Sequence, residues 1–385
     1  LSIASYLAIK EVWRNRGRFL LVSMVIALIT LLVLFIAALG EGLGNGNREY
    51  ISKLDGELIV YQAKSDFLIS ASRLSRDRLA AIKRVDGVAD AGMLGTSNAT
   101  LILNSLKAPL KVALLGIDVG HTGEPKVLEG VQLSTNQADE VIIDRATQVR
   151  TNLKVGDSIT LRVTQGTQDE FFDLRVAGIS DGQQYSLQPS IFVPFYTWDR
   201  IRPKSEAEVN NSNPVPNVMI VKLVDPSKVD VVSAAITNQV KNVEVATIKQ
   251  AIAALPGYSA QQSTLNTQGG FTLFIGILVI GGFFQIQILQ KVAQIGVLKA
   301  IGASNPVVGA ASIIQIVVVT IIGVAIGGAL TFLFSLSFPP TVPIVFNGTT
   351  SAIALVALLL IGPLGGLVSI RYAVRIEPLK ALGLS

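Results

Sequence analysis

Long apolar segments occupy both ends of this chain and flank a polar middle. Residues 19–40 contain no charged side chain, and residues 270–370 contain only two, Lys291 and Lys299. A helix of about 20 apolar residues is long enough to cross the hydrocarbon core of a bilayer. The pattern therefore predicts a first membrane span at residues 19–40 and further spans near the C-terminus.

The C-terminal apolar run is too long for one span, and two features divide it. The lysines of residues 290–306 interrupt it once. The three prolines within Phe338–Pro343 interrupt it again, because proline cannot continue a helix. We therefore expect spans at residues 270–289, 307–336 and 352–370, an outer loop at 337–351 and a tail at 371–385.

Residues 41–269 show the mixed pattern of a water-soluble α+β domain. Short runs rich in β-branched and aromatic residues are separated by Gly, Asn, Asp and Pro, which is typical of strands joined by turns. We expect two lobes, with a middle lobe at about 116–205 interrupting the outer one. The expected strands are 57–62, 101–103, 112–117, 140–143, 158–164, 171–179, 218–224 and 243–247, and the expected helices are 75–84, 144–152 and 226–241.

Residues 1–18 combine basic and aromatic side chains at helical spacing. Lys10 and Arg14 alternate with Tyr6, Ile9 and Trp13, and Arg16 and Arg18 follow. Such a helix lies in the membrane interface, with tryptophan at headgroup depth and cations facing anionic lipid. Membrane lipid is therefore an expected partner of this segment.

Composition and charge support this reading and narrow the function. The chain is 50% hydrophobic with a mean hydropathy of +0.53, and it has no cysteine, which excludes disulfides, thiolate zinc sites and iron–sulfur clusters. Residues 41–270 carry a net charge of −2 and the remainder carries +7. The positive charge lies beside apolar spans, so it indicates membrane topology and not nucleic-acid binding.

The charge distribution predicts an orientation. With four spans, the three basic short segments fall on one side of the membrane and the polar domain falls on the other. The predicted fold is a multi-pass α-helical membrane protein with four transmembrane helices and a large α+β extracytoplasmic domain inserted between spans 1 and 2. Both termini are expected in the cytoplasm, and the protein in the plasma (inner) membrane.

Residues 290–306 are the stretch around which we expect the function to be organised. Ile295, Leu298 and Ile301 recur at helical spacing, and Gly302 suits a C-terminal stop because glycine takes left-handed backbone angles without steric cost. A short helix held at the membrane surface suits gripping a protein in the water phase. The alternative is an ordinary loop helix.

Catalytic chemistry has little support in the sequence. No Gly-Lys pair occurs, so the chain lacks the phosphate-binding loop that an ATP site of that kind needs. His121 is the single histidine and is interpreted as a surface residue, because metal sites need several ligands. We expect no catalytic residues, no metal and no cofactor on this chain. A membrane-tethered hydrolase rests only on polar residues of the outer domain.

The segment QKVAQIGVLKAIGAS at 290–304 resembles the coupling segment of the FtsX/MacB-type (type VII) permeases of ABC transporters. Glu140–Leu161, with its Gly-Asp turn, and Ile376–Leu382 resemble further family stretches. The resemblance implies a permease homodimer and two copies of a separate ATPase that binds ATP-Mg. It also implies the coupling residues Lys291, Gln294, Ile295, Gly296, Leu298, Lys299, Ile301 and Gly302. Many members have an acidic residue where Gln294 stands, which puts a salt contact there in doubt.

The run Leu32–Asn47 is similar to the first-span exit of HrtB-like haem-efflux permeases without a fused ATPase domain, and DevC-like permeases are next. This resemblance implies haem or a similar amphiphile as cargo, with Glu41 as a candidate ligand and Phe35, Tyr50 and Met24 as secondary candidates. The alternative is that Glu41 only marks the water interface. Small residues at Gly323–Gly327 and Gly362–Gly366 suit helix contacts, either between subunits or within one.

The leading hypothesis is therefore the membrane subunit of an ABC exporter that expels a lipophilic substrate by using ATP hydrolysis on a separate chain. One alternative is an FtsX-like signalling permease that regulates a cell-wall hydrolase and moves no substrate. Another is a MacB/DevC-type mechanotransmitter that works with a periplasmic adaptor.

Overall fold

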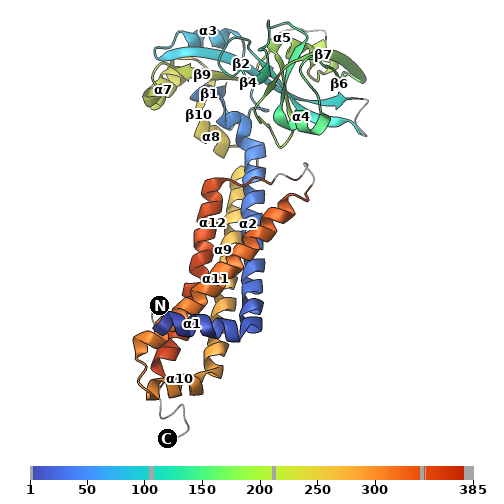
Figure 1. The fold of residues 1–385 in the computed structure, drawn as a ribbon. Helices are drawn as coiled ribbons and strands as arrows, with labels where there is room; N and C mark the ends of the chain where they lie inside the picture. Colours follow the sequence, from blue (N-terminus) through green and yellow to red (C-terminus); the bar gives the residue numbers. More distant parts are fainter. Residues whose placement is uncertain (1–2, 104–107, 210–213, 339–341, 343, 377–385) are drawn as a thin grey trace. The chain divides into compact units, whose positions relative to one another are not determined.

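Four long helices dominate the first of the two units into which the chain divides, Leu1–Gly42 with Gln262–Ser385. They are α2 (Arg16–Ser52), α9 (Tyr258–Gln290), α11 (Asn305–Ser335) and α12 (Gly348–Arg375), shown in Figure 1. Each is long and apolar enough to cross a membrane. The computed structural model describes residues 3–103, 108–209, 214–338, 342 and 344–376.

The fold class predicted from the sequence is confirmed: four candidate spans are present, and a mixed α/β domain lies between the first and the second in the chain. The helices extend beyond the apolar runs, because polar residues such as Arg48 and Gln261 continue their hydrogen bonding past the membrane-length segments. Three stretches with sequence predictions lie outside the described residues: the prolines 339, 340 and 343, residues 210–213, and the part of the family-like stretch that follows Ile376.

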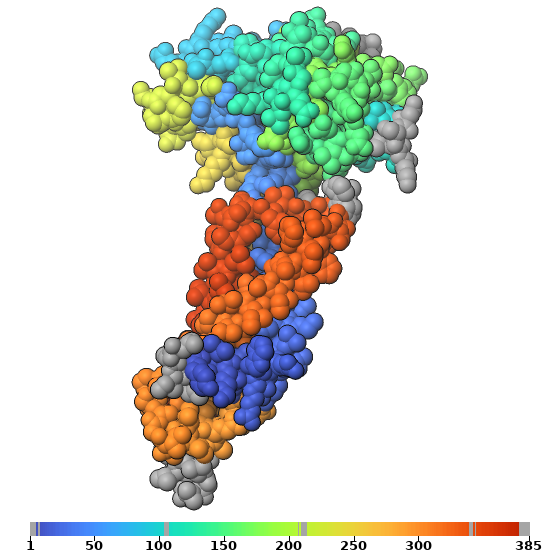
Figure 2. All heavy atoms as spheres, in the orientation of Figure 1, coloured from blue at the N-terminus to red at the C-terminus, as the bar shows by residue number. Residues whose placement is uncertain are grey.

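Two short helices complete the membrane unit. Helix α1 (Ile3–Arg14) packs on α11, and α10 (Val292–Ala300) connects α9 to α11. Figure 2 shows α1 in dark blue lying against the orange surface of α10 and α11. On α1, Ala8 is buried, whereas Tyr6, Ile9 and Trp13 are exposed, as an interfacial helix requires.

Glycines bring the long helices into close contact within the unit. A Cβ added at Gly327 would lie 2.5 Å from the carbonyl oxygen of Ala27 on α2, and one at Gly281 would lie 2.7 Å from the carbonyl oxygen of Gly365 on α12. Gly362 and Gly366 lie against side chains of α11. The small-residue faces seen in the sequence are therefore occupied by packing within one subunit.

The second unit, Leu43–Gln261, contains one ten-stranded sheet in the order β10-β1-β9-β2-β3-β8-β5-β7-β4, with β6 paired to β2 and β7. Its inner surfaces carry buried Ile, Leu, Val and Phe side chains in three clusters. The strands are β1 (Leu58–Gln62), β2 (Val88–Ile102), β3 (Leu110–Ile117), β4 (Val127–Gly130), β5 (Glu140–Asp144), β6 (Ser158–Gln165), β7 (Gln168–Ser180), β8 (Ser190–Pro194), β9 (Val218–Leu223) and β10 (Val243–Thr247).

Short helices cover this sheet. They are α3 (Asp77–Lys83), α4 (Arg145–Thr151), α5 (Phe195–Ile201), α6 (Glu206–Val209), the 3₁₀ turn η1 (Pro226–Lys228), α7 (Val229–Gln239) and α8 (Ile248–Ala253). Figure 1 shows α3 and α7 beside one half of the sheet and α4 and α5 beside the other. Residue 116, where the middle lobe was expected to begin, falls inside β3, so the hydrogen-bonded sheet is continuous there.

The strand β2 is much longer than the expected segment 101–103. Its first part contains Gly92, Gly95, Ser97 and Asn98, which have low strand propensity, and tertiary pairing with β9 and β3 overrides that preference. Gly95 is required there, because a Cβ would lie 2.5 Å from the ring of Trp198.

Asp144 ends β5 and caps α4. Its Oδ1 accepts a hydrogen bond from the backbone N–H of Thr147 at 2.6 Å. Burial raises the pKa of the Asp144 carboxyl to about 6, and the hydrogen bonds from Thr147 oppose that rise. The family-like stretch 140–161 therefore forms the predicted strand, helix and Gly-Asp turn around a buried acid.

The two neighbouring glycines of α9 give a matched test of close helix packing. Gly281→Ala should destabilise the protein by about 1–3 kcal/mol, because its methyl group overlaps backbone atoms of α12. Gly282→Ala meets nothing within 4 Å and should leave stability unchanged or slightly higher. Thermal unfolding of the purified proteins in detergent measures both. Equal unfolding temperatures for the two variants would contradict the close contact between α9 and α12.

Candidate functional site

Helix α10 is the short helix predicted within residues 290–306. It spans Val292–Ala300, with Lys291 and Ile301 at its two cap positions, and Gly302 follows with a φ of +105°. The N–H of Gly302 donates to the carbonyl of Lys299 at 3.0 Å, and the N–H of Ala303 donates to the carbonyl of Leu298 at 3.1 Å. These two bonds form a Schellman motif, which needs the left-handed residue that Gly302 supplies.

One side of α10 packs against the membrane helices. Val292, Ile295 and Leu298 are partly buried against a small cluster of residues from α9, α11 and the end of α12, which contains Ile288, Val308, Ala373 and Ile376. Gly296 is buried on the same helix. Leu298 therefore helps to fix α10 to the bundle.

The other side of α10 is open. Val297 is 47% exposed and Ile301 is 77% exposed. Gln294, nearer the start of the helix, is exposed as well. The sequence predicted that Ile295, Leu298 and Ile301 share one apolar face. This prediction is wrong for Ile301, which does not lie on the buried side with the other two. Each residue turns an α-helix by about 100°, so three-residue steps drift by about 60° each, and Ile301 points away from Ile295.

The two lysines of the segment form contacts inside the unit. Lys299 Nζ donates to the carbonyl oxygens of Val374 at 2.7 Å and Ile376 at 2.9 Å, at the C-terminal end of α12. These carbonyls have no partner within the helix, and a cation there also opposes the negative end of the helix dipole. Lys299, expected as a contact for the ATPase, is used to cap α12.

Lys291 is paired with Glu11 of α1, and its ammonium lies 5.6 Å from the ring centroid of Phe19. Glu11 also accepts a hydrogen bond from Gln315 Nε2 of α11 at 2.7 Å. Arg18 contacts Gln290 beside this pair. Lys291 was expected at the ATPase surface, but only 13% of its side chain is exposed, so it links α10 to α1 instead.

Sequence reasoning missed the roles of Glu11 and Gln315. A signal for Glu11 was present, because it is one of only two acidic residues outside positions 41–270. An acid beside a membrane span without a partner would be costly, which points to a nearby cation. No pattern in the sequence identified Gln315 or Lys299 as binding partners, because their contacts join segments far apart in the chain.

Glu41 lies near the end of the membrane part of α2. Its Oε1 accepts a hydrogen bond from Asn347 Nδ2 at 3.2 Å, and Asn347 caps α12 by accepting from the N–H of Thr349 at 3.0 Å. The ring of Phe35 lies 5.6 Å from that of Phe338. Glu41 and Phe35 thus lie on one helix, near aromatic and polar residues of the loop that precedes α12.

The two other candidates do not join Glu41. Tyr50 is 1% exposed and packs against Tyr185 and Phe192 in the core of the second unit, so its expected role as a ligand is wrong. Met24 is 60% exposed and precedes Glu41 on the same helix by about 25 Å, at 1.5 Å per residue. One small ligand cannot contact both Met24 and Glu41.

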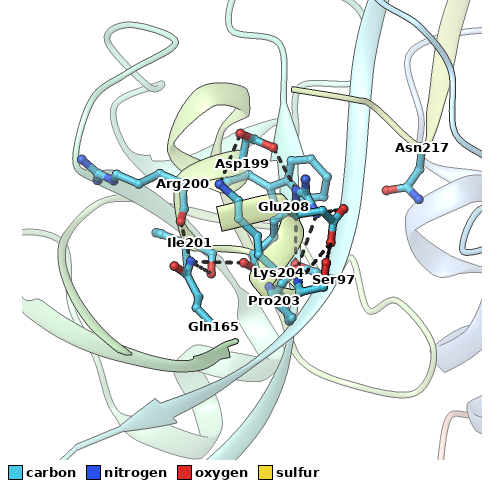
Figure 3. A network of polar contacts seen from close by, with 12 residues as sticks. Ser97, Gln165, Asp199, Arg200, Ile201, Pro203, Lys204, Glu208 and Asn217 are labelled. Carbon is cyan, nitrogen blue, oxygen red and sulfur yellow. Dashed lines mark hydrogen bonds and ion pairs between the residues drawn. The ribbon is translucent and has the colours of Figure 1, made fainter. Parts of the chain in front are cut away.

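The second unit, Leu43–Gln261, is the predicted extracytoplasmic domain and is called the outer unit from here on. It has a cleft of about 880 Å³ lined by aromatic and charged side chains. Trp198 Nε1 donates to Ser97 Oγ at 3.0 Å, and Arg202 Nε donates to Asp199 Oδ1 at 2.9 Å. Figure 3 shows Lys204 and Glu208 in the same network. Asp199, Arg202, Lys204 and Glu208 pair with one another, and no histidine is among the described residues that line the cleft.

His121 lies in another part of the outer unit. Its Nδ1 is 3.0 Å from Asp90 Oδ1, and Lys83 Nζ lies 3.2 Å from the same oxygen. The imidazole is exposed, in a surface group of charges. Among the described residues, no group of three or more His, Asp or Glu is arranged to hold a metal ion.

Comparisons with known proteins match nearly the whole chain. Residues 19–239 match the family of MacB-like periplasmic core domains, and residues 267–378 match the FtsX-like permease C-terminal family. A Staphylococcus haemolyticus protein named as a hemin transport system permease, HrtB, is 24% identical over 381 residues, covering 98% of this chain and 99% of that protein. An uncharacterised ABC transporter permease of Mycobacterium tuberculosis is 25% identical over 393 residues, with the same coverage.

Among solved structures, the periplasmic region of MacB from Actinobacillus actinomycetemcomitans is similar to this chain with a TM-score of 0.38 and 12% identity. It covers 52% of this chain and 92% of that structure.

The ion pair between α1 and Lys291 can be tested by exchanging its charges. Glu11→Lys and Lys291→Glu should each lower thermal stability, since each places two like charges together in a partly buried site. The double variant should recover most of the loss, with a coupling of about 1–3 kcal/mol in a double-mutant cycle. Thermal unfolding in detergent measures it. Additive losses in the double variant would show that the pair does not hold α1 to α10.

Proposed function

The chain belongs to the family of permeases with a MacB-like periplasmic core domain, and from this premise we propose that it is the membrane subunit of an ABC exporter driven by a separate ATPase. It is an ABC transporter permease, with a C-terminal part of the FtsX-like permease family. The observation that carries the proposal is α10, whose inner face is fixed to three other helices while Val297 and Ile301 remain exposed.

The exposed face of α10 suits docking into a groove of a soluble ATPase. Helices that dock in this way present apolar side chains at intervals of three or four residues, and Val297 and Ile301 are four apart. Gln294, which is exposed three residues before Val297, adds a neutral hydrogen-bonding group. The proposed docking surface, called the ATPase seat, therefore consists of two apolar side chains and one amide. Lys291 and Lys299 hold the helix that carries it in position.

The proposed orientation places α10 and both termini in the cytoplasm. Basic residues flank the spans at the N-terminus, at 291–299 and at 371–375, and positive loops favour the cytoplasmic side. A soluble ATPase binds ATP-Mg there. The complex is proposed to contain two copies of each subunit.

Motion of α10 would reach the membrane helices through its fixed contacts. Lys299 connects α10 to the end of α12, and Lys291 connects it to α1 through Glu11. Gln315 extends the second connection to α11. Closure of the ATPase would therefore displace several elements together, which is the way a permease converts ATP hydrolysis into transport.

The proposed cargo is haem or a similar lipophilic molecule with polar groups. Two observations support it: the relative from Staphylococcus haemolyticus is named for hemin transport, and Glu41 and Phe35 supply a carboxylate and an aromatic ring at one end of α2. An exposed apolar face of α2 is available for a second copy, with Leu20, Leu21, Met24 and Leu28.

If the ATPase docks on the exposed face of α10, acidic side chains introduced on that face should prevent its binding. Val297→Asp with Ile301→Asp should abolish co-purification of the ATPase, because carboxylates would be buried in an apolar groove, while the permease keeps its unfolding temperature. Val224→Asp with Val231→Asp, at two exposed valines of the outer unit, is the matched control and should retain the ATPase.

Leu298→Asp should behave differently from that pair. Its side chain is partly buried in the bundle, so it should lower the unfolding temperature of the permease itself. Retention of the ATPase by the folded Val297 and Ile301 double variant would contradict docking at this face.

The cargo proposal predicts a loss of haem resistance. Glu41→Gln keeps the shape of the side chain and removes its charge, so cells should accumulate haem and grow poorly in hemin as cells lacking the permease do. Glu206→Gln, on an exposed helix of the outer unit, is the control. Haem content and growth in hemin are the measurements.

Two outcomes would redirect this proposal. Normal haem handling together with a cell-separation defect in cells without the permease would favour a signalling permease of the FtsX type. Loss of efflux on removal of a periplasmic adaptor would favour the tripartite MacB/DevC type.

A further inference from the structure

A cavity of about 430 Å³ lies within the membrane unit, between α1, α9, α10 and α11. Val297, Ile301 and Glu41 do not line it, whereas Gln294 lies at its border with the exposed face of α10. Pockets of this size commonly hold one small molecule or the head of a larger one. Its lining combines two exposed cations, the buried amides of Gln287 and Gln315, and an apolar floor, and each of these restricts what the cavity can bind.

The mouth of the cavity is positively charged. Lys10 and Arg14 line it from one face of α1, four residues apart. Glu11 also lines it, but its charge is balanced by Lys291. The Arg14 guanidinium has no ion pair or hydrogen bond with any residue that the structure describes, and the Lys10 ammonium contacts only the Tyr6 hydroxyl, at 3.2 Å.

Gln287 of α9 lines the interior of the cavity. It is only 3% exposed, and within the described part of the chain its side-chain amide has no hydrogen-bond partner. Its amide is therefore available to an occupant of the cavity, to which it can donate a hydrogen bond.

Apolar side chains form the floor of the cavity, and Asn15, Gln294, Ser312 and Gln315 add further polar groups to its lining. Phe284, Ile288, Leu298 and Ile316 supply the floor from three helices. The exposed Tyr6 and Trp13 on α1 mark the depth of the headgroup region, because these aromatic residues prefer that layer. Lys10 lies between these two aromatic residues in the sequence, and Arg14 directly follows Trp13, so the mouth is at the depth of lipid phosphates.

We propose that this cavity binds one anionic phospholipid of the leaflet in which α1 lies. The phosphate group lies between Lys10 and Arg14, ester oxygens accept from the Gln287 amide, and the start of an acyl chain covers the apolar floor. The lipid then touches both α1 and α10. It fills the space between them, so that displacement of α10 is passed to α1 instead of being absorbed by the cavity.

The test is a lipid titration of the purified full-length permease in detergent. Phosphatidylglycerol should raise the unfolding temperature at low concentration, and phosphatidylcholine should not. Lys10→Gln with Arg14→Gln should need about thirty-fold more phosphatidylglycerol for half of the shift, since each cation contributes attraction to an anionic surface.

Two further variants separate a lipid site from general surface charge. Arg16→Gln with Arg371→Gln removes two exposed cations that do not line the cavity, and it should titrate like the unchanged protein. Gln287→Leu should weaken the response to phosphatidylglycerol several-fold. If Gln287 were only a strained core residue, the leucine would stabilise the protein and leave the titration unchanged, which would overturn the role given to it.

Three results would overturn the site itself. They are equal effects of the two lipids, an unchanged titration in the Lys10 and Arg14 double variant, and a shift produced by hemin but not by phosphatidylglycerol. The last result would identify the cavity as a cargo entrance. None of these results depends on the identity of the ATPase, so the lipid site and the exporter assignment can fail separately.

Discussion

Helix ends beside a membrane must have their free backbone groups satisfied, because little water is available there to do it. In this protein that requirement shapes the region around α10. Lys299 binds the last carbonyls of α12, the Schellman motif at Gly302 closes α10, and Asn347 caps the start of α12. These bonds fix the positions at which the helices end.

The same bonds fix α10 to the helix bundle. An ordinary loop helix between two spans would be held mainly by its chain connections. Helix α10 is instead held by a cation bound to carbonyls, by an ion pair to Glu11 and by an apolar cluster. Such contacts are partly buried and therefore resist separation more than exposed ion pairs do. The face left open is then the only one that can accept a partner without disturbing the bundle, among the surfaces of α10 that the structure describes.

Close packing by glycine serves the same end inside the bundle. Without a hydrophobic driving force in lipid, helices associate through close contact and polar groups. The pairs Gly281 with Gly365 and Gly327 with Ala27 bring backbones together, and Ser369 donates to the carbonyl of Gly281. Four helices packed in this way move as a body, which suits transmission of force from α10. The exposed apolar side chains on α2 remain available for lipid or a second subunit.

The sequence by itself determined the number of spans, the domain between the first and second, and the location of the short helix between the second and third. These follow from local properties: the length of apolar runs, the lack of charge and the turn at Gly302. It also suggested Ile301 as a contact residue, which the structure leaves exposed. Only the tertiary structure decided that Leu298, Lys291 and Lys299 face inward, that Tyr50 is a core residue, and that β2 is a long strand. The physical reason is that these outcomes depend on partners such as Glu11, Val374 and β9, which are distant in the chain, and a sequence pattern carries no record of which distant groups meet.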